Sequence, residues 1–155
     1  MFCFSGCREG KIEKMPVTIF ELQCHKGVGP NVEGRALVTE DDFSARYDLN
    51  RIKGIFSRPQ HGLAGQSYVG RILVFNNVKG GVASAWMLHE MKNRNLAPAA
   101  ILFNRANPII VQGAQLANIT LCDRFQSGDI TQLVKTGDVV KVFPLEGVVT
   151  VEREF

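Results

Sequence analysis

Residues 70–103 read GRILVFNNVKGGVASAWMLHEMKNRNLAPAAILF and determine which class of fold the chain can adopt. The four apolar residues at 72–75 follow Gly70 and precede polar residues, which is the pattern of a short strand buried on both faces. A second apolar run of this kind occupies residues 99–103. Both runs are therefore predicted to be buried strands.

The residues between these two strands have the period of an amphipathic helix. Over residues 82–95, one apolar face can be shared by Val82, Trp86, Met87 and Met91. Proline cannot continue a helix, so Leu96-Ala97-Pro98 is expected to end it. We therefore expect Trp86 and Met91 to hold this helix against the core.

Outside this unit the chain is predicted to consist mainly of strands. Apolar and β-branched runs predict strands at residues 17–24, 32–39, 139–143 and 147–152, the last two as a hairpin around Pro144-Leu145-Glu146. A short apolar helix is expected between residues 109 and 117. Strands at both ends and two helices in the middle predict a mixed α/β domain.

The composition is that of one globular domain. The 155 residues are 45% hydrophobic and 21% charged, which allows a core without disulfides. The net charge of +3 comes from scattered lysines and arginines, so neither a nucleic-acid partner nor a membrane surface is indicated. No stretch approaches the roughly 20 apolar residues of a membrane span. A soluble, cytoplasmic protein is expected.

The four cysteines, Cys3, Cys7, Cys24 and Cys122, do not have the spacing of a closed metal site. They are expected to be reduced thiols, and the chain is expected to bind no metal. Residues 1–14 show no period and precede Met15-Pro16, which predicts a flexible extension followed by a single domain at residues 15–155.

Residues 40–66 form a polar connection that is unusually long for a compact domain. It also contains apolar residues that can anchor it to the core, at positions 43, 47, 52, 55 and 56. We therefore predict an ordered loop that faces a ligand through Arg46, Asp48 and His61. The alternatives are a surface ion pair of Arg46 with Asp48 or Asp42, and a structural role for the histidine.

Lys79-Gly80-Gly81 joins the first buried strand to the helix and is the strongest local signal of a binding site. Free amides at a helix start point outward, the helix dipole favours an anion by roughly 0.3 to 1 kcal/mol, and Lys79 adds a positive charge. Ser84 is the nearest hydroxyl. The turn lacks the motif of a nucleotide-binding loop. It is predicted to bind a small carboxylate or phosphate, with a plain strand-to-helix turn as the alternative.

A second polar turn follows the second buried strand. Arg105 can hold a carboxylate through two hydrogen bonds, and Asn104 and Gln112 can add neutral ones. Ligands of open α/β sheets bind beyond the carboxyl ends of the strands. The alternative is a solvated turn without a ligand.

Several short motifs follow one another along the chain. They are HGLAGQS at 61–67, GRILV at 70–74, KGG at 79–81, APAA at 97–100, QGA at 112–114, TGDVVKV at 136–142 and EG at 146–147. In this order, from about residue 27 to 151, the sequence resembles the swivelling-domain subunit of the aconitase X family. The resemblance implies a single swivelling β/β/α domain.

The same resemblance implies the small subunit of a heteromeric hydro-lyase. Members of the family dehydrate phosphomevalonate or cis-3-hydroxy-L-proline, and an aconitase-like large subunit holds an iron or iron–sulfur centre. Dehydration needs a base, a Lewis acid and a clamp for the substrate's carboxylate or phosphate. We expect this chain to supply the clamp and one wall of the active site, to bind no cofactor, and to be inactive alone.

Two departures from the family pattern bear on the reaction. Related subunits carry serines where Gly81 and Val82 stand, and one of those serines is taken to be the catalytic base, so no catalytic residue is assigned to this chain. Arg46 and Asp48 replace a glycine-rich loop, which favours a hydroxyproline-like substrate over phosphomevalonate. The alternative function is a non-catalytic, stand-alone domain that binds a small carboxylate or phosphate.

Overall fold

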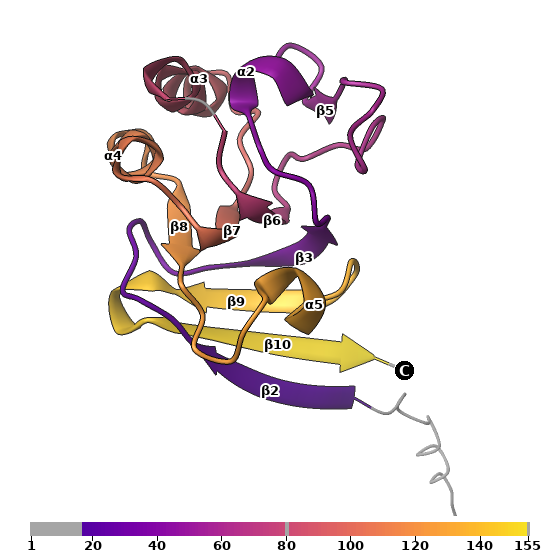
Figure 1. The fold of residues 1–155 in the computed structure, drawn as a ribbon, viewed down its shortest axis with the longest axis vertical. Helices are drawn as coiled ribbons and strands as arrows, with labels where there is room; N and C mark the ends of the chain where they lie inside the picture. The colour runs from indigo at the N-terminus through magenta and orange to yellow at the C-terminus, as the bar shows by residue number, and fades with distance from the viewer. Residues whose placement is uncertain (1–16, 80, 155) are drawn as a thin grey trace, which may run out of the picture.

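The computed structural model describes residues 17–79 and 81–154, and its main feature is a seven-stranded mixed sheet. The strand order is β2-β10-β9-β3-β6-β7-β8 (Figure 1). The strands are β2 (Val17–Gln23), β3 (Val32–Val38), β6 (Ile72–Asn77), β7 (Ala100–Arg105), β8 (Thr120–Asp123), β9 (Val139–Phe143) and β10 (Val148–Glu154). The helices are α2 (Ala45–Asp48), α3 (Val82–Asn93), α4 (Pro108–Ala117), α5 (Ile130–Leu133) and the 3-10 turn η1 (Pro144–Glu146).

The sheet has an antiparallel half and a parallel half that share β3. β3 pairs antiparallel with β9 and parallel with β6, and β7 and β8 continue the parallel half. In the antiparallel half, β2 pairs with β10 along its whole length, so that Val17 lies opposite Glu154. Helices α3 and α4 pack over the parallel half, whereas α5 lies on the other side (Figure 1).

The two edge strands approach each other through the segment that follows β2. Val28 forms an antiparallel bridge with Leu121 of β8, with N–H to O distances of 3.0 Å in both directions. The amide of His25 donates to the carbonyl of Asp123 at 3.2 Å. We call this contact of residues 24–28 with residues 121–123 the seam. It closes the sheet around part of the core.

Buried apolar side chains form two clusters on opposite faces of the parallel strands. Leu73 and Phe75 belong to the cluster under α3 and α4, whereas Ile72 and Val74 belong to the cluster enclosed by the antiparallel half. All four are 0% exposed. The predicted strand with two buried faces is therefore confirmed.

Helix α3 buries a different face from the predicted one. Its buried residues are Ser84, Leu88 and Met91, whereas Val82 and Trp86 are 60% and 67% exposed. Both sets recur at helical spacing, so the period alone does not indicate which of them faces the sheet. The prediction that Trp86 holds the helix against the core was wrong.

Helices α3 and α4 approach each other closely at Gly113. A Cβ atom at this position would lie 2.5 Å from the Cβ atom of Ala85, too close for a real contact. α4 begins at Pro108, after the N-cap Asn107, whose side chain accepts a hydrogen bond from the amide of Ile110 at 2.8 Å. It ends at Asn118, which adopts the left-handed conformation.

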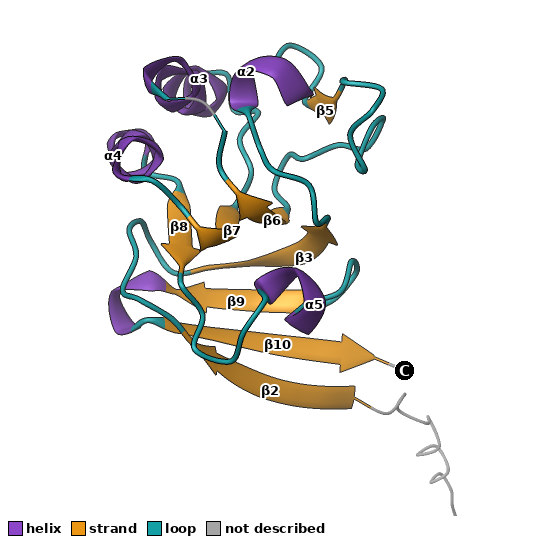
Figure 2. Ribbon diagram, in the orientation of Figure 1, coloured by secondary structure: helices purple, strands orange, loops and turns teal. Residues whose placement is uncertain are grey.

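The remaining predicted elements are largely confirmed (Figure 2). The terminal hairpin forms from β9, η1 and β10, and the long loop is ordered around α2 and the ribbon of β4 (Leu49–Asn50) and β5 (Ile55–Phe56). Ile52, expected to anchor this loop, is instead 74% exposed. β8 and α5 were not predicted. The predicted extension at residues 1–14 lies outside the described residues.

Candidate functional site

The two predicted binding turns lie next to each other at the carboxyl edge of the parallel strands. Asn77, near the end of β6, is the pairing partner of Arg105 at the end of β7. The turn to α3 therefore starts beside the turn to α4, as expected for parallel strands whose ends meet at one edge. The sheet thus places Arg105 beside the strand end that leads to Lys79, although the two residues are far apart in the sequence.

Both of these cations are available to a ligand. Lys79 and Arg105 are exposed, and neither side chain has a hydrogen-bond or ion-pair partner among residues 17–79 and 81–154. The backbone of Lys79 is fixed, because its amide donates to the carbonyl of Phe43 at 2.7 Å. Two unpaired positive charges at one sheet edge can bind a carboxylate or a phosphate.

The start of α3 leaves room for a ligand or a larger side chain. Gly81 is the N-cap residue, and no side chain caps the helix. A Cβ atom at Gly81 would meet only the Cδ1 atom of Ile109, at 3.9 Å. The space around position 81 would therefore accommodate a serine side chain. Gly80, also predicted to belong to the site, lies outside the described residues.

Asn104 supports this edge through hydrogen bonds within the protein. Its amide nitrogen donates to Asn76 Oδ1 at 3.0 Å and to Asp129 Oδ1 at 2.7 Å, and its oxygen accepts from the amide of Ile130 at 2.7 Å. These bonds tie β6, β7 and α5 together, so its side chain holds the edge in place. Hydrogen bonds from Thr131, and then from Asn104, lower the pKa of Asp129 below its usual value.

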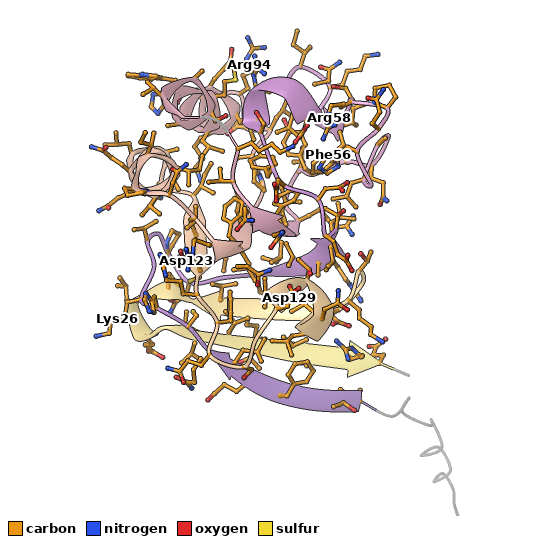
Figure 3. All side chains as sticks on the ribbon, viewed as in Figure 1. Lys26, Phe56, Arg58, Arg94, Asp123 and Asp129 are labelled. Atoms are coloured by element: carbon orange, nitrogen blue, oxygen red, sulfur yellow. The ribbon has the colours of Figure 1, made fainter. Side chains whose placement is uncertain are left out.

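Asp48 and His61 form a buried cluster within the long loop. Asp48 is 1% exposed and accepts hydrogen bonds from Arg58 Nε at 2.5 Å and from the Ser44 amide at 2.8 Å. Arg58 and Phe56 lie beneath α2 (Figure 3). Asp48 pairs with Arg58. The predicted alternative pairing of Asp48 with Arg46 involves a side chain that lies outside the described part of the structure.

The imidazole of His61 is held in one orientation. Its Nδ1 atom accepts from the amide of Leu63 at 3.1 Å, and its ring stacks on Phe56 with a centroid distance of 4.9 Å. Nε2 lies 3.7 Å from Asp48 Oδ2, beyond hydrogen-bonding distance. Burial lowers the pKa of His61, and the Asp48 carboxylate opposes this shift. These contacts give His61 a structural role in this structure.

Ser84 and Gln112 lie apart from the turns that carry Lys79 and Arg105. Ser84 is 1% exposed, and its hydroxyl has no hydrogen-bond partner in the described part of the chain. Gln112 is exposed and lines a groove between α3 and α4. Ser84 therefore faces the core, while Gln112 faces outward one helical turn from the candidate site.

Comparisons with known proteins identify the family of this domain. Residues 21–151 match the family model described as the aconitase X swivel domain. The chain belongs to the aconitase X swivel family.

Individual relatives agree with this assignment. The phosphomevalonate dehydratase small subunit of Methanothrix thermoacetophila is 34% identical over 67% of this chain and 76% of its own length. That of Methanococcoides burtonii is 32% identical over 86% and 96%. The crystal structure of Thermococcus kodakaraensis aconitase X in its holo form superposes with a TM-score of 0.78 at 30% identity, covering 84% of this chain and 97% of that one. The predicted swivel fold is confirmed.

The aconitase X swivel domain also carries an exposed apolar groove beside the candidate site. The groove has a volume of about 520 Å³. It is lined by Val82, Ala85, Trp86, His89, Ile109, Gln112, Gly113 and Leu116. Trp86 and Leu116 are 67% and 72% exposed, and none of the described residues that line the groove is a lysine, arginine, aspartate or glutamate. Because Ile109 is next to Gly81, the groove begins at the start of α3.

The sequence analysis missed the acidic residues that shape this edge of the swivel domain. Asp42 Oδ1 accepts from the amide of Asn77 at 3.1 Å, and Asp123 Oδ2 accepts from the amide of Ala106 at 3.0 Å. Asp129 is the N-cap of α5 and accepts from the amide of Thr131 at 2.9 Å. An aspartate just before an apolar helical segment is a recognisable capping signal, so Asp129 could have been found.

No metal site or membrane helix is evident within the described residues. Among residues 17–79 and 81–154, no three His, Cys, Asp or Glu side chains are grouped to bind a metal ion. Over the same residues, none of the helices has the length and apolar character needed to cross a membrane. Cys3 and Cys7 are outside the described part of the structure.

Proposed function

We propose that this chain is the small subunit of an aconitase X-type dehydratase and binds the anionic group of the substrate between Lys79 and Arg105. The observation that carries this proposal is the pair of unpaired cations at adjoining ends of β6 and β7. Relatives with this fold are named as small subunits of a dehydratase. An anion clamp is the part of a dehydration site that this edge can supply.

The remaining chemistry is assigned to an aconitase-like large subunit. A glycine and a valine, Gly81 and Val82, occupy the first positions of α3, and neither can act as a base. We therefore propose that the large subunit carries both the general base and an iron or iron–sulfur centre. The metal would polarise the leaving hydroxyl, while this chain orients the substrate.

We propose a small hydroxy acid with an anionic group as the substrate. Phosphomevalonate is the first candidate, because the relatives are named for it. The expected preference for a hydroxyproline-like substrate rested on Arg46 and Asp48, but Asp48 is buried and pairs with Arg58. Hydroxyproline is thus the comparison substrate, not the favoured one.

Reconstitution with the large subunit tests this function. The two chains should co-purify, iron should accompany the large subunit only, and dehydration of phosphomevalonate or hydroxyproline should require both chains. A chain that binds phosphate alone but never associates with the large subunit would instead support the stand-alone binding domain.

The groove between α3 and α4 supports a contact with the large subunit next to the site. An apolar surface without charged residues is typical of the buried centre of an interface. Trp86→Glu should therefore reduce co-purification at least tenfold, without lowering the stability of the isolated chain, because Trp86 is 67% exposed.

A matched control is Leu145→Glu, which places the same charge on η1 at a residue that is 71% exposed. This variant should bind the large subunit like the unmodified chain. If both variants bound the large subunit equally well, the groove would not be part of the interface.

A further inference from the structure

The seam brings two buried thiols together. Cys24 follows β2 and Cys122 lies in β8, so they belong to the two opposite edges of the sheet. Both are free cysteines, 9% and 0% exposed, and both belong to the buried cluster enclosed by the antiparallel half of the sheet.

The backbone on both sides keeps the two thiols close. The amide of Cys24 donates to the carbonyl of Gly147 at 2.9 Å, and His25 and Val28 bond to the strand that carries Cys122. Between them, a Cβ atom at Gly27 would lie 2.0 Å from the carbonyl oxygen of Leu121 and 2.8 Å from Cys122 Sγ. Only glycine permits this approach, so residues 24–28 pack directly against the strand that carries Cys122.

The two thiols differ in acidity and access. The hydrogen bond from Cys122 lowers the pKa of the Cys24 thiol, whereas the same bond and burial raise the pKa of Cys122. Cys24 is also the more exposed of the two. A thiolate is the reactive form of cysteine, so Cys24 is the sulfur that reacts first with a small oxidant.

We propose that Cys24 and Cys122 are an oxidation site, at which a peroxide converts the thiol pair into a disulfide across the seam. The Cys24 thiolate attacks one oxygen of hydrogen peroxide, the O–O bond breaks, and hydroxide leaves, which gives a sulfenic acid and, with the thiol proton, one water. The Cys122 sulfur then displaces the hydroxyl from Cys24, and the Cys122 proton leaves with it as a second water. The two sulfur atoms lose two electrons in total, and the peroxide gains them.

The disulfide would join the two edges of the sheet by a covalent bond. Such a bond closes a long loop and stabilises mainly by restricting the unfolded chain. It would also fix β8, whose last residue, Asp123, holds the amide of Ala106 beside Arg105. The oxidation site does not require the proposed dehydratase function.

The test uses the full chain with Cys3→Ser and Cys7→Ser, so that only the seam thiols remain. After hydrogen peroxide treatment, the chain is unfolded in the presence of an alkylating reagent that labels free thiols. Its mass is then measured by mass spectrometry. We expect a mass lower by two hydrogen atoms, no alkylation, reversal by dithiothreitol, and an unfolding midpoint raised by several degrees.

Two single variants test the order of the steps. With Cys122→Ala, the sulfenic acid on Cys24 should persist and react with dimedone. With Cys24→Ala, Cys122 should stay reduced because it is buried and its pKa is raised. Full alkylation of both thiols, at a peroxide concentration that oxidises Cys3 and Cys7 in the unsubstituted chain, would overturn the proposal. Disulfides formed only between separate molecules would also overturn it.

Discussion

At the scale of single residues, Lys79 provides charge without supporting the fold. Its side chain is exposed and has no partner among the described residues. Lys79→Ala should therefore weaken turnover or substrate binding in the assembled complex tenfold or more, about 1.4 kcal/mol, without changing the unfolding midpoint. Steady-state kinetics and thermal unfolding measure these two effects.

A control for lost charge is Lys53→Ala, which removes an exposed lysine from the turn between β4 and β5. This variant should retain full activity. Unchanged kinetics for Lys79→Ala would exclude the turn from the active site and leave Arg105 as the better candidate.

His61 should make the stability of the domain depend on pH. Burial lowers its pKa in the folded state below the usual value of about 6.5, so the unfolded chain binds the proton more readily. This stability is fully present above about pH 6.5 and is lost as the pH falls below that value through the lower folded-state pKa, with a slope of at most about 1.4 kcal/mol per pH unit. Urea unfolding between about pH 7.5 and 5 measures the slope.

The matched variants separate His61 from the exposed histidines. His61→Asn should remove the pH dependence of the free energy of unfolding between about pH 6.5 and 5, because an asparagine side chain does not titrate. His89→Asn, at an exposed position on α3, should retain it. A slope that persists in His61→Asn would assign the pH dependence to another group.

At the scale of elements, the contact between α3 and α4 depends on Gly113. Its missing side chain lets Ala85 pack against α4, and a Cβ atom there would lie 2.5 Å from that of Ala85. Gly113→Ala should therefore force the helices apart and lower the free energy of unfolding by roughly 1 to 3 kcal/mol. Chemical denaturation measures this loss.

A double variant distinguishes this clash from a change in helix propensity. Ala85→Gly removes the opposing Cβ atom, so the pair Ala85→Gly and Gly113→Ala should be more stable than the sum of the single changes predicts. Additive effects would show that the two residues do not clash. Gln115→Ala, on the exposed side of α4, should be nearly neutral.

The elements were predictable from the sequence where one local pattern determined them. The run Ile72 to Phe75 predicted a strand buried on both faces, because four apolar residues in succession cannot alternate with solvent. For α3 the local pattern was ambiguous, since Val82 and Trp86, four residues apart, and Leu88 and Met91, three residues apart, both fit a helical period. Only the packing against the sheet decided between them.

The candidate site was predictable to a similar extent. Lys79 and Arg105 were found because they follow buried strands, and the topology then placed those strand ends together. Asp48 was predicted to face a ligand, but it lies 10 residues before its partner Arg58 in an irregular loop. No periodicity relates two such positions, so the sequence did not reveal the pairing.

At the scale of the whole molecule, the domain from β2 to β10 should be stable without the preceding segment. The two core clusters consist of residues between Phe20 and Val151. Removal of residues 1–14 should therefore leave the melting temperature and association with the large subunit unchanged. A midpoint lowered by several degrees would show that this segment contributes to the fold.

The pairing of β2 with β10 constrains how the chain can fold as it leaves the ribosome. β3, β6, β7 and β8 emerge in the order in which they lie in the sheet, so the parallel half can assemble progressively. Among the strands of residues 17–79 and 81–154, β2 emerges first, but it pairs in the described sheet with the last strand, β10. Because synthesis adds about 5 to 20 residues per second, the hydrogen-bonding groups of β2 remain without this partner for several seconds or more. β2 is thus synthesised early and placed late, and nascent chains stalled before β10 should be vulnerable to chaperone capture at β2.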